Sequence, residues 1–312
     1  METVDCKQIT LVADSGSTKT DWIVAETRQT FHTQGINPVL MSEEGIVEIL
    51  QRELIPQLDV LLPLMVEGCG LSVYFYGAGV RPNAVGVMQR AIGRAIGYQE
   101  LVAGRKWGGT PVVNAASDLL GAARALCGHR EGIACILGTG ANSCLFDGEQ
   151  IIANTPALGF ILGDEGGGAA LGKRFLNAIF KGLLPATMRD DYLATTGLTL
   201  NEVIRRVYRE PMPNRFLAST SLYIGQHLDN EALRELVVEN FRQFFTHNIG
   251  PYQRHDLPVG FVGSIAAHYE PLLREAAQAE GYTLGTILPS PIVSLCDYHQ
   301  GRGGATPPSA PG

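Results

Sequence analysis

The six cysteines of the sequence never occur in the C-x-x-C spacing of zinc ribbons or thioredoxin-like motifs. They are scattered along the chain, which is typical of buried thiols in a reducing compartment: Cys6, Cys69, Cys127, Cys135, Cys144 and Cys296. No apolar run reaches the roughly 18–20 residues that cross a bilayer. The N-terminus also lacks the basic segment and apolar stretch of an export signal. We therefore expect a cytoplasmic protein with no membrane partner.

An excess of positive charge is also missing. Lysine and arginine number 24 against 31 aspartate and glutamate residues, which gives a net charge of −7 and argues against a nucleic-acid partner. Hydrophobic residues make up 45% and charged residues 18% of the chain, as in globular proteins. With 312 residues the chain is long enough for two domains, and its 37 glycines predict many tight turns or close approaches of backbone to ligand.

The first part of the sequence predicts the element order β-β-β-α-β-α-β-α. Alternating apolar residues indicate an antiparallel meander of three strands at Gln8–Ala13, Thr20–Glu26 and Gln29–Gln34. Ser42 then precedes a helix that extends to about Leu58. The remaining elements are a strand, a helix, a strand and a helix, at Leu71–Tyr76, Ala84–Ile96, Thr110–Val113 and Asp118–Cys127.

The pattern then begins again with a second meander. Its strands are expected at Gly132–Leu137, Ser143–Phe146 and Gln150–Ala153, with the turn signal Asp147-Gly148 between the last two. Mostly helical sequence follows, and two short strands near the end complete the unit. The expected helices are Glu165–Phe180, Leu200–Tyr208, Arg215–His227, Asn230–His247 and Ile265–Glu280, and the strands are Val259–Val262 and Thr283–Leu288.

A turn of small and hydroxylic residues, Asp14-Ser-Gly-Ser-Thr-Lys-Thr20, joins the first two predicted strands. It is neither a P-loop nor a dinucleotide fingerprint, because the next element is a strand and the glycine spacing differs. Such a turn can still bind a phosphate through backbone N–H groups and hydroxyls, or it can be a plain polar hairpin turn. The candidate phosphate ligands are Gly16, Ser17, Thr18 and Lys19, and Asp14 could hold Mg²⁺ through water.

A second turn of this kind, with Gly138, Thr139 and Gly140, begins the second half. The pair resembles the two phosphate motifs of the sugar kinase, heat-shock protein 70 and actin superfamily. The residues Gly263-Ser264-Ile265-Ala266 resemble the adenosine motif of that superfamily, so Gly263, Ser264 and Ala266 are further candidates for ATP binding.

The segment LGFILGDEGGGA, from Leu158 to Ala170, is similar to the N-acetylglucosamine kinase branch and to the related BadF/BadG/BcrA/BcrD-type ATPases. The resemblance extends from about Ile9 to Tyr298. It implies an α/β fold of two RNase H-like (actin-like ATPase) domains, with mixed five-stranded sheets around an interdomain nucleotide cleft. The implied domains are 1–115 completed by a helix near 290–300, and 116–290 with a helical insertion; residues 301–312 form a flexible tail rich in glycine and proline.

Asp118 follows a predicted buried strand and begins a helix. From the residues alone it could be an N-cap, a common role worth about 1 kcal/mol. The resemblance implies instead the catalytic base of the kinase, and the two roles can coexist. It also implies that ATP and Mg²⁺ take part in the reaction and that an amino sugar is the acceptor, while a homodimer stays open.

The resemblance assigns the sugar to several residues that have plainer explanations. Asn37 could be a turn residue and Asp164 could complement a helix dipole. The implied sugar ligands are Asn37, Asn142, Asp164 and Gly168. Two departures affect acetamide recognition, since Pro38 and the run Thr155–Gly159 replace a tryptophan and a Cys-Gly-Gly-Trp-Gly run of the family.

Three functions therefore stay open at this point. The first is ATP-dependent phosphorylation of N-acetylglucosamine or a relative such as N-acetylmuramic acid. The second is an ATPase that energises a partner enzyme and carries an iron–sulfur cluster between two subunits, for which Cys127 and Cys135 would be the nearest cysteines. The third is a non-catalytic sugar sensor. Asp14 and Asp118 are both present, which favours an enzyme.

Overall fold

The structure, a computed structural model, describes residues 6–16, 18–58, 65–97 and 109–302. The chain forms two compact units, and the first also includes a segment near the C-terminal end. The first unit is Met1–Gly128 with Pro291–Gly304, and the second is His129–Ser290 with Ala305–Gly312. Most of the expected tail, 303–312, lies outside the described residues.

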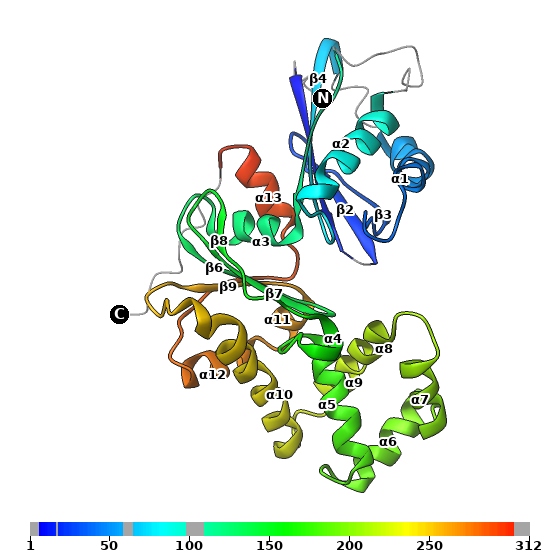
Figure 1. Cartoon of the computed structure of the whole chain (residues 1–312), viewed down its shortest axis with the longest axis vertical. Helices are drawn as coiled ribbons and strands as arrows, with labels where there is room; N and C mark the ends of the chain where they lie inside the picture. The colour runs from blue at the N-terminus through cyan, green and yellow to red at the C-terminus, as the bar shows by residue number, and fades with distance from the viewer. Residues whose placement is uncertain (1–5, 17, 59–64, 98–108, 303–312) are drawn as a thin grey trace. The chain divides into compact units, whose positions relative to one another are not determined.

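The first unit contains a mixed five-stranded sheet in the order β3-β2-β1-β4-β5 (Figure 1). The first three strands pair antiparallel, whereas β4 runs parallel to β1 and β5 runs parallel to β4. Helices α1 and α2 pack on one face, and α3 and α13 pack on the other. The elements are β1 Cys6–Ser15, β2 Lys19–Val24, β3 Thr30–Gln34, α1 Glu43–Ile49, β4 Met65–Gly77, α2 Pro82–Gly97, β5 Val112–Ser117, α3 Asp118–Cys127 and α13 Ile292–His299.

Alternation along the strands determines which face of this sheet forms the core. On β1 and β4 the side chains of Leu11, Ala13, Val73 and Phe75 point to the face under α1 and α2 and are fully buried, as is Trp22 on β2. Burying one large apolar side chain contributes about 1.5–3 kcal/mol. The residues between them, Asp14 among them, point to the opposite face, where the candidate catalytic side chains lie.

The second unit repeats the sheet. Its strands follow the order β8-β7-β6-β9-β10. β6, β7 and β8 form an antiparallel meander, whereas β9 runs parallel to β6 and β10 runs parallel to β9, as in the first sheet. Both sheets are therefore RNase H-like, as the sequence resemblance implied. The strands are β6 Gly132–Leu137, β7 Ala141–Phe146, β8 Ile151–Ala153, β9 Val259–Val262 and β10 Leu284–Leu288.

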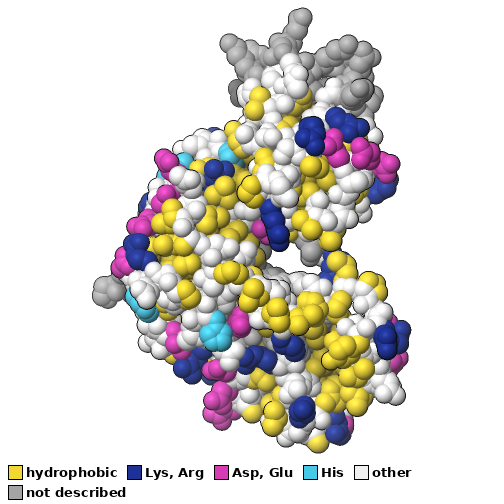
Figure 2. All heavy atoms as spheres, viewed as in Figure 1, with side chains coloured by type: hydrophobic (Ala, Val, Ile, Leu, Met, Phe, Trp, Pro, Cys, Tyr) yellow, Lys and Arg dark blue, Asp and Glu magenta, His cyan; other side chains and the backbone are white. Residues whose placement is uncertain are grey.

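A long helical segment separates β8 from β9. Figure 2 shows hydrophobic side chains exposed on this part of the surface. The exposed apolar residues of the segment include Ile161 and Leu162 on α4, and Ile204 and Tyr208 on α7. None of the helices in the described part of the chain is long and apolar enough to cross a membrane. The helices of the unit are α4 Gly159–Leu162, α5 Gly168–Phe180, α6 Ala186–Thr196, α7 Leu200–Tyr208, α8 Pro213–Ser219, α9 Ser221–Gln226, α10 Glu231–Phe244, α11 Ser264–His268 and α12 Glu270–Ala279.

Two helices that the sequence predicts as continuous are interrupted. The helix expected at Arg215–His227 breaks at Thr220, whose hydroxyl donates to the carbonyl of Leu217 at 2.8 Å and competes with the helical pattern. The helix expected at Ile265–Glu280 breaks at Tyr269, because Pro271 near the start of α12 cannot continue a preceding helix. The helix expected from Glu165 begins only at Gly168.

The fifth strand lies further along the chain than expected. The sequence places it at Thr110–Val113, whereas β5 spans Val112–Ser117 and pairs with β4 until Ser117 lies beside Gly77. The small residues from Asn114 to Ser117 were expected to form a loop. They form part of an edge strand instead, because pairing with β4 stabilises the extended backbone. As a result Asp118 follows the strand directly.

His299 attaches α13 to this sheet. Its ring stacks on Tyr74 with centroids 3.6 Å apart, and its Nε2 lies 2.8 Å from the Tyr76 hydroxyl. Burial, together with the nearby positive charge of Arg124, lowers the pKa of His299 from 6.5 to about 4. The imidazole is therefore neutral at neutral pH and accepts a hydrogen bond from Tyr76.

We expect acid to weaken this attachment. Between pH 6.5 and 4 the unfolded state binds a proton at His299 that the folded state does not, so stability falls as pH falls, by at most about 3 kcal/mol at pH 4. His299→Gln retains an acceptor for Tyr76 but cannot titrate. Its melting temperature should therefore fall less steeply than that of the wild type from pH 7 to pH 4, and parallel curves would contradict the assignment.

Candidate active site

The first glycine turn closes the hairpin between β1 and β2. The backbone N–H of Gly16 donates to the carbonyl of Lys19 at 3.0 Å, and the hydroxyls of Ser15 and Thr20 lie 2.7 Å apart beneath it. Ser15 also binds the backbone of Ile36 at 3.0–3.1 Å, which fixes the following loop. Gly16 and Thr18 are exposed at the tip, and Ser17 lies outside the described residues. Hydrogen bonds of Ser15 and Thr20 thus fix the base of the turn, while its tip is exposed to solvent.

Asp14 lies at the end of β1, in register with Asp21 on β2 and Tyr76 on β4. Burial and the nearby carboxylates of Asp118 and Asp21 together raise the pKa of Asp14 from 3.8 to about 7, against a smaller lowering by Lys19. A carboxyl group among like charges favours a bound cation. Among the described residues, no group of three or more acidic, histidine or cysteine side chains is arranged to hold a metal alone. Asp14 therefore fits Mg²⁺ that keeps several waters and phosphate ligands.

Asp21 is a site residue that the sequence analysis missed. Only 8% of it is exposed, and its carboxylate lies 2.9 Å from Lys19 Nζ and 2.7 Å from His32 Nδ1. It therefore orients the lysine that we expect to meet a phosphate. The hairpin register could have revealed it, since a turn between Ser15 and Thr20 places residue 21 opposite Asp14.

Asp118 is the first residue of α3, and it is not the N-cap. That role belongs to Ser117, whose Oγ accepts a hydrogen bond from Leu120 N at 3.2 Å. Asp118 Oδ1 accepts a bond from Leu119 N at 2.9 Å. Burial nevertheless raises the pKa of Asp118 above its ordinary value of 3.8. The N-cap interpretation was therefore wrong, because Ser117 caps α3 and Asp118 accepts the N–H of its neighbour Leu119.

Asn37 lies beside the Gly77–Gly79 turn of the same unit. Its Oδ1 accepts a hydrogen bond from Val39 N at 2.9 Å, which makes an Asx-turn, and a Cβ added at Gly79 would lie 2.2 Å from that oxygen. The role of Asn37 as a turn residue thus explains the hydrogen bond of its side-chain oxygen. The side-chain N–H₂ of Asn37 stays available as a donor for a ligand.

The second glycine turn connects β6 to β7 and is bound to the start of α5. Gly138 N donates to the carbonyl of Gly140 at 3.0 Å, while the carbonyls of Gly138 and Thr139 accept from Gly168 N and Ala169 N at 2.8 and 2.9 Å. A Cβ added at Gly138 would meet no atom within 4 Å. The turn is therefore rigid, and the space beside Gly138 is open to a ligand.

Asp164 reaches the same turn from the loop before α5. Its Oδ1 accepts a hydrogen bond from Ala141 N at 3.2 Å, and a Cβ at Gly140 would lie 2.8 Å from its carboxylate. The residue is 9% exposed, and burial raises its pKa above 3.8. Its φ of 56° is a left-handed conformation that aspartate and asparagine tolerate better than most residues. Oδ2 keeps its acceptor capacity for a ligand.

The remaining predicted ligands of the second unit lie in two places, at the start of α11 and on β7. Gly263 has a φ of +126°, and a Cβ there would lie 2.2 Å from the carbonyl of Leu137, so the start of α11 packs directly against the second glycine turn. Ser264 and Ala266 follow it on α11. Asn142 lies on β7, where its Oδ1 accepts from Ser143 N and from Asn154 Nδ2 at 2.9 and 3.0 Å. The structure thus brings the turn, the Asp164 loop and α11 together within one unit.

Comparison with known proteins identifies the family. No protein-family model and no curated protein matches the sequence significantly. Among solved structures, a protein of Porphyromonas gingivalis is 42% identical with a TM-score of 0.84, and the match covers 94% of this chain and 99% of that one. A protein of Chromobacterium violaceum is 15% identical with a TM-score of 0.65, over 95% and 99% of the two chains. Both are described as a "putative N-acetylglucosamine kinase".

A third solved structure supports the fold alone. It is a ROK family glucokinase of Streptomyces griseus in complex with glucose and AMPPNP, 12% identical with a TM-score of 0.56, and the match covers 93% of this chain and 98% of that one. Identity at the level of the first structure, over nearly the whole of both chains, establishes family membership. The chain therefore belongs to the N-acetylglucosamine kinase family.

Proposed function

We propose that the protein is an ATP-dependent kinase of an amino sugar, with N-acetylglucosamine or N-acetylmuramic acid as the acceptor. The observation that carries this proposal is the pair Asp14 and Asp118. Asp14 lies at the end of β1, and Asp118 directly follows β5, with β4 between these two strands. The two half-buried carboxyl groups interact electrostatically, and both have raised pKa values. Carboxyl groups that burial perturbs in this way are typical of catalytic sites.

Asp118 would act as the general base. It accepts the proton of the sugar hydroxyl while that oxygen bonds to the γ-phosphorus, and the bond from phosphorus to ADP breaks on the opposite side. A raised pKa makes the carboxylate a stronger base near neutral pH. Asp14 would hold Mg²⁺ through water, and the ion would supply neutralisation of the phosphate charge.

The two glycine turns would bind the phosphates of ATP. Gly16, Thr18 and Lys19 of the first unit offer N–H groups and an ammonium that Asp21 orients. Gly138 of the second unit offers an open position beside a rigid turn. Gly263, Ser264 and Ala266 would lie along the nucleoside, as the family resemblance implies. Asn37, Asn142, Asp164 and Gly168 would bind the sugar.

Sugar-dependent release of ADP tests this function. Mg·ATP and the wild-type protein should be incubated with N-acetylglucosamine, N-acetylmuramic acid, glucosamine and glucose in turn. We expect ADP release to depend on an N-acetyl sugar and to vanish without Mg²⁺. Equal turnover of glucose and N-acetylglucosamine would reject acetamide recognition, and ADP release that no sugar stimulates would reject the kinase.

Asp164→Asn should weaken sugar binding selectively. Asparagine tolerates the left-handed backbone and keeps an acceptor for Ala141 N, but it removes the charge that would strengthen bonds to sugar hydroxyls. We expect KM for the sugar to rise about 10–100-fold, with the stabilisation of the protein by ATP unchanged.

Asp147→Asn is the matched control for this variant. It is the same substitution in the same unit, at an exposed carboxylate that also accepts backbone N–H groups, from Glu149 and Gln150 at 2.8 Å. Its KM should equal that of the wild type. If Asp164→Asn also leaves KM for the sugar unchanged, Asp164 is a structural residue of the loop.

The partner-energising ATPase finds no support in the cysteines. Cys135 is fully buried on β6, in the hydrophobic core of the second unit. A ligand of a cluster between two subunits must reach the surface, and the Cys135 side chain does not. Cys127, at the end of α3, is only partly buried, but it belongs to no group of three or more potential metal ligands among the described residues. We therefore do not propose a second function.

A further inference from the structure

The first unit contains a cavity of about 390 Å³ on the sheet face that carries α3 and α13. Its walls are β4, β5 and these two helices, with Gln89 from α2, and all of the lining residues belong to the first unit. The volume lies within the range of small-molecule sites. The main lining side chains are Tyr74, Tyr76, Asn114, Arg124, Tyr298 and His299. Neither Asp14 nor Asp118 lines it, so the cavity is separate from the candidate active site.

Strand register creates the aromatic wall. Tyr74 and Tyr76 alternate on β4 and pair with Asn114 and Ala116 on the edge strand β5, so all four face the same side. α3 can approach this wall because Gly121 has no side chain; a Cβ there would lie 2.9 Å from the ring of Tyr76. From this position α3 contributes Leu120 and Arg124 to the lining of the cavity.

Arg124 supplies the charge of the cavity. Its Nη1 donates to the Tyr76 hydroxyl at 2.7 Å, and its guanidinium lies 5.8 Å and 5.4 Å from the ring centroids of Tyr76 and Tyr298. Its Nε is buried and makes no hydrogen bond to any described residue. No acidic residue lines the cavity, and no ion pair of Arg124 is present in the described part of the chain.

The neighbours of Arg124 leave this charge without compensation. The Tyr76 hydroxyl has one proton, which it donates to His299 Nε2 while it accepts from Arg124. His299 is neutral, since burial holds its pKa near 4. Buried charges are normally paired, because removing an ion from water is costly. A cation with open donors in an aromatic cavity is complementary to an anion attached to a flat ring.

We propose that this cavity binds a small organic anion, a carboxylate or a phosphate attached to an aromatic ring. The anion bonds to the free donors of Arg124, the ring packs on Tyr74 and Tyr298, and the amides of Gln89 and Asn114 lie at the rim. The site needs neither ATP nor a sugar, so it stands or falls independently of the proposed kinase activity.

Calorimetric titration of the full chain with benzoate, phenyl phosphate, inorganic phosphate and cyclohexanecarboxylate tests this site. We expect one of the two aromatic anions to bind with a Kd of about 1 mM or tighter. Which of the two binds more tightly distinguishes a carboxylate from a phosphate site. Inorganic phosphate and cyclohexanecarboxylate should bind more weakly, because each lacks the aromatic ring.

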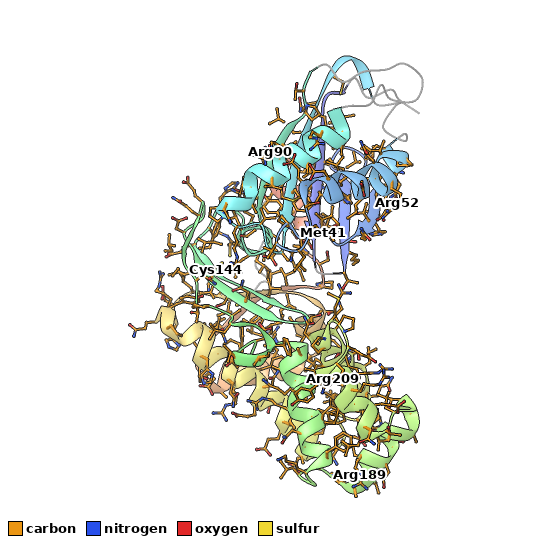
Figure 3. All side chains as sticks on the ribbon, turned by 45° about the vertical axis from the view of Figure 1, so that its right-hand side comes forward. Met41, Arg52, Arg90, Cys144, Arg189 and Arg209 are labelled. Carbon is orange, nitrogen blue, oxygen red and sulfur yellow. The ribbon has the colours of Figure 1, made fainter. Side chains whose placement is uncertain are left out.

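Two variants and one control complete the test. Arg124→Gln should weaken binding about 10–100-fold, because it removes the charge that the anion requires. Asn114→Phe should abolish binding by filling the cavity, and an aromatic residue opposite Tyr74 suits an edge strand, so folding is preserved. Arg90→Gln is the control: Arg90 lies on α2 of the same unit (Figure 3), and its partner Glu43 keeps Arg94.

The proposal is overturned if neither aromatic anion binds the wild type, or if cyclohexanecarboxylate binds as tightly as benzoate. It is also overturned if Arg124→Gln and Asn114→Phe bind like the wild type. Equal loss in Arg90→Gln would place the anion elsewhere and would reject the site as well.

Discussion

Replacing Asp118 by asparagine is expected to lower kcat for sugar phosphorylation by about 10²–10⁴-fold, the usual contribution of a general base. The amide cannot accept the proton of the sugar hydroxyl. The fold should not suffer, because Ser117 caps α3 and the asparagine oxygen can still accept the bond from Leu119 N. KM for ATP should change little, since the substitution leaves the nucleotide-binding residues intact.

Steady-state kinetics with Asp256→Asn as control measures this effect. Asp256 is an exposed carboxylate whose partner Arg254 keeps a second partner, Glu131, so its loss should leave kcat unaltered. The melting temperature of each variant shows whether the protein is folded. A folded Asp118→Asn protein with turnover near that of the wild type would remove Asp118 from the catalytic role.

Gly138→Val is expected to abolish the stabilisation of the protein by ATP. Valine fits the backbone, since Gly138 does not adopt a positive φ and a Cβ there meets nothing within 4 Å. The added methyl groups would occupy the open position where we place a phosphate. At an ATP concentration of 100 times Kd the wild type gains about 2.7 kcal/mol of stability, and the variant should lose this gain.

Gly138 is a better position than Gly140 for this substitution. At Gly140 a side chain would strike the carboxylate of Asp164, so a defect there could come from the sugar loop. Gly93→Val is a matched control, because a Cβ at Gly93 on α2 also meets no atom within 4 Å. If ATP raises the melting temperature of Gly138→Val as it does that of the wild type, the second glycine turn does not contact the phosphates.

Combining variants tests whether both turns bind the same nucleotide. Lys19→Met should weaken ATP binding by removing one charge from the first turn. If both turns hold one ATP molecule, a protein with both Lys19→Met and Gly138→Val should show no ATP-dependent stabilisation beyond that of Gly138→Val alone. A residual effect that only Lys19→Met removes would indicate two separate nucleotide sites.

Periodicity in the sequence was sufficient to predict the duplicated sheet. The first meander alternates at Thr20–Glu26, the second begins with the apolar run Gly132–Leu137, and each glycine turn interrupts apolar residues at a hairpin. The end of β5 was not predictable in this way. Asn114 to Ser117 lack apolar alternation and become a strand only because β4 offers an edge for pairing.

The candidate site was predictable to the extent that local motifs define it. Asp14, Asp118 and the two turns stand out because their residue types interrupt apolar strands. Asp21 did not stand out, since its role depends on the register that sets it against Asp14. The bond from Ala141 N to Asp164 joins residues far apart in the chain, and no local pattern indicates it.

Phosphorus NMR of a mixture of the wild-type protein, Mg·ATP and N-acetylglucosamine tests the central claim most directly. We expect a growing phosphomonoester signal from the sugar in step with the signals of ADP, and we expect this signal to be absent with Asp118→Asn. Growth of inorganic phosphate without any sugar phosphate would show an ATPase instead. An unchanged spectrum with N-acetylglucosamine and with N-acetylmuramic acid would contradict the proposed kinase.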